Sequence, residues 1–329
     1  MTTSTILNRR LFLSLSAAVA VAALPHVSSA QTVWPTGTVQ LLVPARAGGG
    51  TDAAARVLAG ALQERTGQSF VVVNNPGGGG VVAAETVRAA APDGQTLLFF
   101  HSGIFSMYHT GTYDHSPLDE FTTAAELAVG SSYSLAVSAD SPYQTTADLV
   151  AASIAAPNSI SLGVQLRGST HFMAGLLVMD SDAQFRIVDA GSDADKLVQL
   201  QGHQIDAALV NTSGALQYVE TGDLRILGTI GGSPDRDAAT PDIPSLVEQG
   251  YERVVYGLDF LIMGPAGMDP AVVSAINAAI NGTVEDPEVS AQLATMNFPL
   301  TAIAADDIPA RLQSIDASVS ATAELLGLN

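Results

Sequence analysis

Short apolar runs that end in glycine-rich loops, each followed by a helical pattern, most constrain the fold of this chain. The run 39–43 is followed by a glycine cluster at 48–50 and by Thr51-Asp52, and apolar residues then recur at helical spacing over 55–62. Glycine permits a tight loop, and Thr or Asp favours the start of a helix. The order strand, loop, helix predicts βαβ units whose parallel sheet is covered by helices on both faces.

The same order recurs along the chain. Further strands or extended segments are predicted at 70–73, 96–100, 134–137, 160–163, 185–188, 207–210, 225–229 and 256–263. Helices are predicted over 82–90, 146–155, 171–179, 194–200, 270–281, 287–296 and 308–326. Two sets of such units indicate an α/β fold with two lobes. Since ligands of open α/β sheets bind beyond the carboxyl ends of the strands, facing lobes would bring several loops to one cleft.

Composition excludes several classes of protein. The 329 residues include no cysteine and carry a formal net charge of −19. A disulfide framework, a thiol nucleophile and a Cys-ligated metal are therefore excluded. The acidic excess argues against nucleic acid as a partner, because phosphate backbones need Lys and Arg. The length predicts about two domains.

Residues 1–30 are predicted to be a signal peptide. Arg9-Arg10 form a basic head, 11–24 is an apolar run too short to span a bilayer, and small residues end at Ala30. The arginine pair resembles a twin-arginine export signal. We therefore expect export to the periplasm, the alternative being a buried N-terminal helix.

The loops before the helices suit an anionic ligand. Helix N-termini present unpaired N–H groups and about half a positive charge, and glycine lets a ligand approach the backbone. The ligand that such a site favours is a carboxylate or a phosphate. A nucleotide cofactor is not expected, because Asn74-Asn75 stand where a ribose-binding acid belongs and no Gly-Lys-Ser/Thr loop exists.

The sequence offers few groups of residues that could form a catalytic or metal-binding site. His101, His109 and His115 could be combined with Asp114 into a metal cluster, but histidines in loops are usually surface residues, and none has the i, i+4 spacing of a helical metal pair. Neither Ser102 nor Ser169 lies in a nucleophile elbow. We expect that the protein binds no metal and no cofactor and is not an enzyme.

An ordered set of motifs carries a family resemblance across the chain after residue 30. The chain resembles the substrate-binding proteins of tripartite tricarboxylate transporters, the TctC or Bug family. The motifs include Gly48-Gly49-Gly50-Thr51-Asp52, Asn74-Asn75-Pro76-Gly77-Gly78-Gly79-Gly80, Pro92-Asp93-Gly94, Gly168-Ser169-x-His171, Gly202-His203-Gln204-Ile205-Asp206 and Pro241-Asp242-Ile243-Pro244-Ser245-Leu246-x-Glu248-x-Gly250.

The resemblance implies a two-lobed periplasmic binding protein, a "Venus flytrap", in which each lobe is a mostly parallel sheet flanked by helices. The first lobe would hold 31–130 plus 252–329 and the second 131–251. Such a receptor captures a small carboxylate (a di-, tri- or aromatic carboxylate) between the lobes and delivers it to a membrane permease of one large and one small subunit. We expect a monomer. The alternatives are a receptor that feeds a two-component sensor kinase and an exported hydrolase or isomerase.

The resemblance also implies ligand contacts, to which we add two arginines and Ser102. Arg46 and Arg167 are expected either to bind a distal carboxylate across the cleft or to be solvated. Asp52 is interpreted as a helix cap or a ligand contact. The stretch 102–109 departs from the family's pattern. The identity of the ligand is therefore the property that the resemblance implies least. The expected ligand-binding residues are Arg46, Ala47, Gly48, Gly49, Thr51, Asp52, Ser102, Arg167, Ser169, Thr170, His171, Ser192 and Asp193.

Overall fold

The first sheet is centred on strands from both ends of the chain. In the computed structural model, the strands of sheet 1 in spatial order are β11 (Leu300–Ala302), β4 (Phe121–Val129), β10 (Phe260–Pro265), β3 (Thr96–His101), β1 (Val39–Val43) and β2 (Phe70–Asn74). β1 pairs in parallel with β2 and with β3, whereas β10 pairs antiparallel with β3 and β4, and β11 antiparallel with β4. β1 to β4 therefore run in one direction.

The second sheet is formed by the middle of the chain. The strands of sheet 2 in spatial order are β7 (Arg186–Asp189), β6 (Ser161–Val164), β8 (Ala207–Asn211), β5 (Tyr133–Ser138) and β9 (Leu224–Ile230). β6 pairs in parallel with β7 and β8, and only β5 runs against its neighbours. Both sheets are therefore mixed, but most of their strands share one direction.

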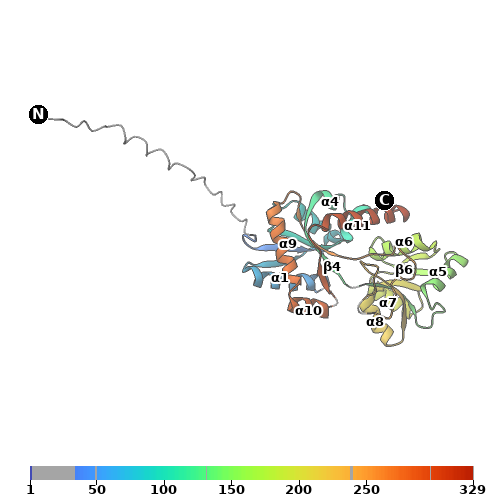
Figure 1. Ribbon diagram of the computed structural model, residues 1–329. Helices are drawn as coiled ribbons and strands as arrows, with labels where there is room; N and C mark the ends of the chain where they lie inside the picture. Colours follow the sequence, from blue (N-terminus) through green and yellow to red (C-terminus); the bar gives the residue numbers. More distant parts are fainter. Residues whose placement is uncertain (2–33, 49, 131, 238–239, 297, 329) are drawn as a thin grey trace. The chain divides into compact units, whose positions relative to one another are not determined.

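Helices cover both sheets (Figure 1). Those that follow or flank sheet 1 are α1 (Gly50–Thr66), η1 (Gly77–Gly80), α2 (Val81–Arg88), α3 (Gly103–His109), α4 (Pro117–Glu120), α9 (Pro270–Val284), α10 (Pro287–Thr295) and α11 (Ile308–Leu325). Those of sheet 2 are α5 (Thr146–Ala155), α6 (Ser169–Ser181), α7 (Asp193–Gln201) and α8 (Thr212–Glu220). α1 packs against α9 and α10, and α7 lies against β8.

Each sheet has an apolar core on both faces. Leu41 faces one core cluster of sheet 1 and its neighbour Leu42 faces the other. In sheet 2, Leu135 and Ala136 divide in the same way. Because successive side chains of a strand point to opposite faces, burial of both faces requires the continuous apolar runs seen in the sequence. Burying one leucine side chain contributes about 2 kcal/mol.

A buried ion cluster joins α11 to sheet 1. The guanidinium of Arg311 binds Glu126 in β4 at 2.9 Å and Asp259, just before β10, at 2.7 Å. Burial raises the pKa of Glu126 to about 7, although the Arg311 pair opposes the shift. This cluster fixes the segment that enters β10.

The structure describes Met1 and residues 34–48, 50–130, 132–237, 240–296 and 298–328, and residues from Trp34 onward form one unit. Apart from Met1, the predicted signal peptide lies outside the described residues. Within them, no helix is both long and apolar enough to cross a membrane. Sheet membership changes between β4 and β5 and again between β9 and β10. The predicted lobe boundaries themselves stay a prediction.

The predicted two-lobed α/β class and most elements are confirmed. The sequence analysis did not predict β4, α3, α4, α8 and β11. β4 was missed because its alanines and Glu126 do not read as a buried strand. Glu126 is tolerated there because Arg311 pairs with it. The extended segment predicted at 256–263 becomes a strand only from Phe260 onward.

Candidate ligand-binding site

Two neighbouring cavities lie beside the predicted loops and share His101, Tyr133, Asp193 and Leu258 in their walls. The large cavity has a volume of about 540 Å³ and the small cavity about 330 Å³. The large cavity is also lined by Arg167, Ser169, Thr170 and Ser192, among others. The small cavity is also lined by Gly50, Thr51, Val129, Asn211, Tyr256, Phe260 and Phe298.

The N-terminus of α1 opens on the small cavity. Asp52 is 2% exposed and accepts hydrogen bonds from the Gly48 N–H at 2.8 Å and from the Asn74 amide at 2.8 Å. Its carboxylate also pairs with Arg56 at 2.9 Å. The Arg56 hydrogen bond lowers the pKa of Asp52 to about 2, with burial acting against it. Asp52 therefore holds the glycine loop in place rather than facing a ligand.

Two backbone N–H groups at this end of α1 are not engaged by the part of the chain that the structure describes. Among the described residues, no oxygen accepts a hydrogen bond from the N–H of Gly50 or Thr51. The first N–H groups of a helix lack intrahelical partners. These N–H groups are available to donate hydrogen bonds to a ligand in the small cavity.

The N-terminus of α6 opens on the large cavity and is braced from the side. Thr170 Oγ1 accepts from the Gln165 N–H at 2.8 Å, and His171 Nδ1 accepts from the Arg167 N–H at 3.1 Å. These bonds fold the loop over the helix start, where Arg167 has a φ of 61°. Burial, followed by the charge of Arg167, lowers the pKa of His171. In the described part of the chain, the N–H groups of Ser169 and Thr170 have no acceptor.

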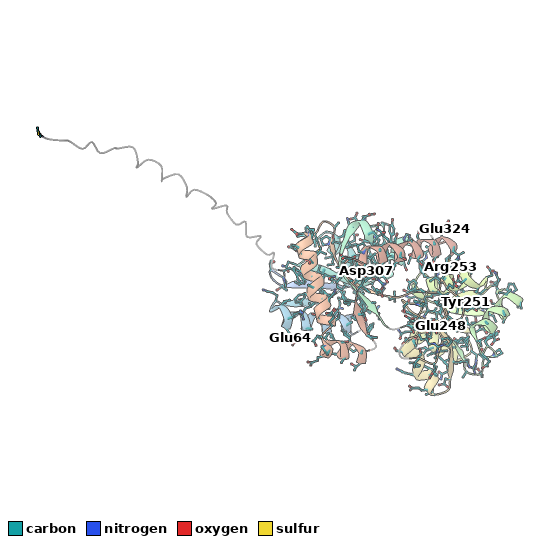
Figure 2. All side chains as sticks on the ribbon, in the orientation of Figure 1. Glu64, Glu248, Tyr251, Arg253, Asp307 and Glu324 are labelled. Carbon is teal, nitrogen blue, oxygen red and sulfur yellow. The ribbon has the colours of Figure 1, made fainter. Side chains whose placement is uncertain are left out.

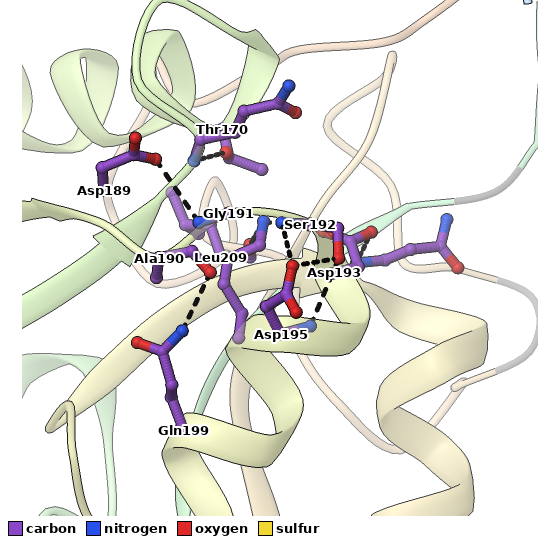
Figure 3. A network of polar contacts seen from close by, with 12 residues as sticks. Thr170, Asp189, Ala190, Gly191, Ser192, Asp193, Asp195, Gln199 and Leu209 are labelled. Atoms are coloured by element: carbon purple, nitrogen blue, oxygen red, sulfur yellow. Dashed lines mark hydrogen bonds and ion pairs between the residues drawn. The ribbon is translucent and has the colours of Figure 1, made fainter.

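The N-terminus of α7 is capped by its own side chains (Figure 3). Asp195 Oδ2 accepts from the Ser192 N–H at 2.9 Å and from its hydroxyl at 2.6 Å, which completes a capping box. Ser192 lines the large cavity, but its donors already have an acceptor.

Asp193 lies at the shared wall with its charge neutralised. Its carboxylate pairs with Lys196 at 2.7 Å and accepts from the Asn211 N–H at 3.1 Å. Lys196 is the only lysine of the chain, is 1% exposed, and also donates to the Leu209 carbonyl at 2.6 Å. The pair ties α7 to β8 and reduces the negative field of Asp193 in both cavities.

Of the remaining predicted residues, those that the structure describes do not line these two cavities. Arg46, Ala47 and Gly48 are exposed and line neither. Ser102 is buried, and its hydroxyl donates to the Gly257 carbonyl at 3.1 Å. Gly49 lies outside the described residues. Arg167 lines the large cavity without Arg46, so only one arginine of the predicted pair is in position there.

His101 is the main cavity residue that sequence reasoning interpreted wrongly. It is not a surface histidine, since it ends β3 and lines both cavities. Its Nδ1 accepts from the Gly103 N–H at 3.1 Å, so the neutral ring carries its proton on Nε2. Burial lowers the pKa of His101 to about 4. Its place at the carboxyl end of a strand was the available signal.

Tyr133 and Phe298 were also missed. Tyr133 opens β5 directly after the first change of sheet, and burial, followed by the charge of Asp193, raises its pKa. Phe298 comes from the segment between α10 and β11, which carries no local pattern. Within the described residues, no three His, Asp or Glu side chains are grouped as a metal site requires.

Known proteins resemble this chain over most of its length. A UPF0065 protein from the gbd 5′ region of Cupriavidus necator is 31% identical over 284 residues, which cover 86% of this chain and 85% of the relative. BugT of Bordetella pertussis is 28% identical over 308 residues, 85% of this chain and 86% of the relative.

Solved structures show the same fold. A TctC solute-binding protein from Polaromonas superposes with a TM-score of 0.76 at 23% identity, covering 89% of this chain and 99% of that one. A Rhodopseudomonas palustris protein solved with adipate gives a TM-score of 0.72 at 24% identity, covering 90% and 99%.

The family comparison is the most direct. Residues 54–319 match the family described as the tripartite tricarboxylate transporter family receptor, TctC. That family consists of solute-binding receptors rather than enzymes. The match includes sheet 2, every strand of sheet 1 except β1, and the helix starts of α6 and α7. The chain therefore belongs to the TctC family of tripartite tricarboxylate transporter receptors.

Proposed function

We propose that this protein captures a small carboxylate in the two cavities and hands it to a membrane permease. Reversible binding is the whole of its chemistry. The ligand oxygens take the hydrogen bonds that the N-termini of α1 and α6 leave unused, and Arg167 supplies a full positive charge at the large cavity.

The observation that carries the proposal is the pair of unoccupied helix N-termini. Gly50 and Thr51 line the small cavity and Ser169 and Thr170 the large one. Hydrogen bonds to a charged group contribute about 1.5–3 kcal/mol each, and more where water is excluded. Two or three such bonds therefore contribute about 3–9 kcal/mol before the cost of association is subtracted.

Ligands of similar structures support the carboxylate class. The Rhodopseudomonas palustris protein described above was solved with adipate. MatC of the same species, with a TM-score of 0.67 at 20% identity, was solved with malate. We extend the shared chemistry of these two ligands, a carboxylate on a short body, to the present chain.

The charge distribution makes local donors necessary. Acidic side chains such as Glu64, Glu248, Asp307 and Glu324 lie exposed on the outside (Figure 2). With a net charge of −19, the protein repels anions at long range unless salt screens it. Attraction must therefore come from groups inside the cavities. Among the described residues that line them, Arg167 is the only Lys or Arg.

We extend the proposal to cellular context. The protein acts as a periplasmic monomer, exported by way of residues 1–30 on the twin-arginine route, and its permease has one large and one small subunit. The arginine pair at Arg9-Arg10 and the family support this assignment.

The sharpest test removes one backbone donor without disturbing the helix. Ser169 is the first residue of α6, where proline is tolerated, and Gly168 before it is extended with φ −97° and ψ 178°. Ser169→Pro should weaken binding of the best carboxylate among adipate, malate and benzoate about 10- to 100-fold in calorimetry.

Ser169→Ala is the matched control, because it removes the hydroxyl and keeps the N–H. It should bind within about threefold of wild type. If Ser169→Pro remains folded and binds as tightly as Ser169→Ala, the donor role of α6 is wrong. If none of the three carboxylates binds wild-type protein, the proposed function is wrong.

A further inference from the structure

The small cavity has an aromatic and apolar wall. Phe260, Phe298, Leu258 and Val129 line it together with two tyrosines. The ring centroids of Phe260 and Phe298 lie 5.7 Å apart, and Phe99 stacks on Phe260 with the centroids 4.6 Å apart. Phe260 is 3% exposed, so this wall is fixed by the core behind it.

The ring of Phe298 lies directly against the start of α1. A Cβ placed on Gly50 would come within 2.6 Å of Phe298 Cζ, so the absence of a side chain at Gly50 is what admits the ring. A carboxylate bound to the first N–H groups of α1 therefore has this aromatic side chain beside it. The edge of an aromatic ring is electropositive and accepts an anionic neighbour.

The small cavity offers no partner for a second negative charge. None of the described residues that line it is Lys or Arg. Its one acidic residue, Asp193, already binds Lys196. A second ionised carboxylate in this cavity would be desolvated without compensation, which is costly. A volume of about 330 Å³ lies at the lower end for small-molecule sites and suits a single ring.

His101 adds a fixed donor at the boundary of the two cavities. A Cβ on Gly103 would meet His101 Nδ1 and Cε1 at 2.5 Å, so the ring orientation is locked. Nδ1 is occupied by the Gly103 N–H, and in the described structure Nε2 has no partner. The donor that remains suits an oxygen of the ligand.

From these walls, we infer that the ligand is an aromatic monocarboxylate. Its carboxylate lies at the boundary of the two cavities beside His101, where the N-termini of α1 and α6 both offer donors, and its flat ring lies against Phe298 and Phe260. The inference rests on the proposed carboxylate-receptor function and selects one ligand class within it. Short aliphatic dicarboxylates are disfavoured, because they bring a second charge and no apolar face.

The test is a calorimetric comparison of four probes with the full exported protein: benzoate, cyclohexanecarboxylate, adipate and malate. Benzoate and cyclohexanecarboxylate carry the same number of carbons and one charge, and differ in flatness. We expect benzoate to bind at least 10-fold more tightly than each of the other three. Equal affinity for benzoate and cyclohexanecarboxylate, or tighter binding of adipate or malate, overturns the inference while leaving a carboxylate receptor. Binding of none overturns both.

Two variants locate the ring. Phe298→Leu should weaken benzoate binding about 10-fold, whereas Leu118→Ala, at an exposed leucine that lines neither cavity, should change it less than threefold. Thermal unfolding of both variants establishes that they fold. Benzoate affinity that is unchanged in folded Phe298→Leu places the ring elsewhere and overturns the inference.

Discussion

The N-termini of α6 and α7 look alike in sequence and differ in what they offer a ligand. Both follow a glycine loop and have a serine at their start: Ser169 is the first residue of α6, and Ser192 is the N-cap that precedes α7. At α7, the third helical residue is Asp195, which reaches back and occupies both donors of Ser192. At α6, the third residue is His171, which instead accepts a bond from the loop at Arg167. The donors of Ser192 at the start of α7 are therefore occupied, whereas among the described residues the N–H groups of Ser169 and Thr170 at the start of α6 remain available.

The difference shows that a glycine loop before a helix is not by itself an anion site. Whether its donors remain available depends on the side chain three positions into the helix. α1 agrees with α6, because Asp52 turns to Gly48, Arg56 and Asn74 and leaves the N–H of Thr51 alone. We therefore propose that the ligand binds chiefly at the N-termini of α1 and α6, and that α7 has a supporting role.

The largest effect is expected from Lys196→Met, which removes the cation that neutralises Asp193 at the start of α7. A buried pair that loses one partner costs about 3–5 kcal/mol, and Asp193 is 37% exposed, so we expect the lower end, about 3 kcal/mol, in urea unfolding. Carboxylate affinity should fall more than 10-fold, because Asp193 then repels the anion.

The double variant Asp193→Asn/Lys196→Met separates charge from packing. It should recover most of the lost stability and affinity, since no buried charge is left without its partner. A double variant as unstable as Lys196→Met alone would contradict the neutralising role.

A smaller effect is expected from Asp52→Asn, which releases the glycine loop before α1. The pKa of Asp52 is about 2 in the folded protein against an ordinary 3.8. Its ionised form therefore contributes about 2 kcal/mol above pH 4, and this contribution is lost as the pH falls from 4 to 2. The variant should be less stable at pH 7 by about that amount, and its stability should decline less than that of wild type between pH 4 and 2. Parallel curves for the two proteins would contradict this role.

The class of the fold and the positions of the helix starts could be predicted from the sequence. Features that depend on contacts between residues far apart in the chain could not. β4 carries Glu126, which only Arg311, far along the chain, makes acceptable in a buried strand. Phe298 and His101 enter the cavity walls through packing on Gly50 and Gly103. Arg46 and Arg167 have equal charge and similar loops, yet Arg167 lines the large cavity and Arg46 lines neither of the two described cavities.

The smallest effect is expected from Asp195→Ala, which opens the α7 end. Loss of the capping box should lower Tm by about 1–3 °C. Carboxylate affinity should rise two- to threefold, because the Ser192 donors become free and a nearby negative charge is removed. Asp148→Ala is the matched control, since it breaks the equivalent box with Thr145 at α5, away from both cavities. It should lower Tm similarly and leave affinity unchanged; equal affinity changes in the two variants would remove the distinction between α6 and α7.

The most direct test is a titration of ¹⁵N-labelled protein with the tightest-binding carboxylate, followed by amide correlation spectra. Charge-assisted hydrogen bonds to a carboxylate move the donating amide proton downfield. We predict the largest downfield shifts at Thr51, Ser169 and Thr170, and little change at Ser192. A Ser192 shift as large as these, or saturation of binding with the α1 and α6 amides unmoved, would contradict the account.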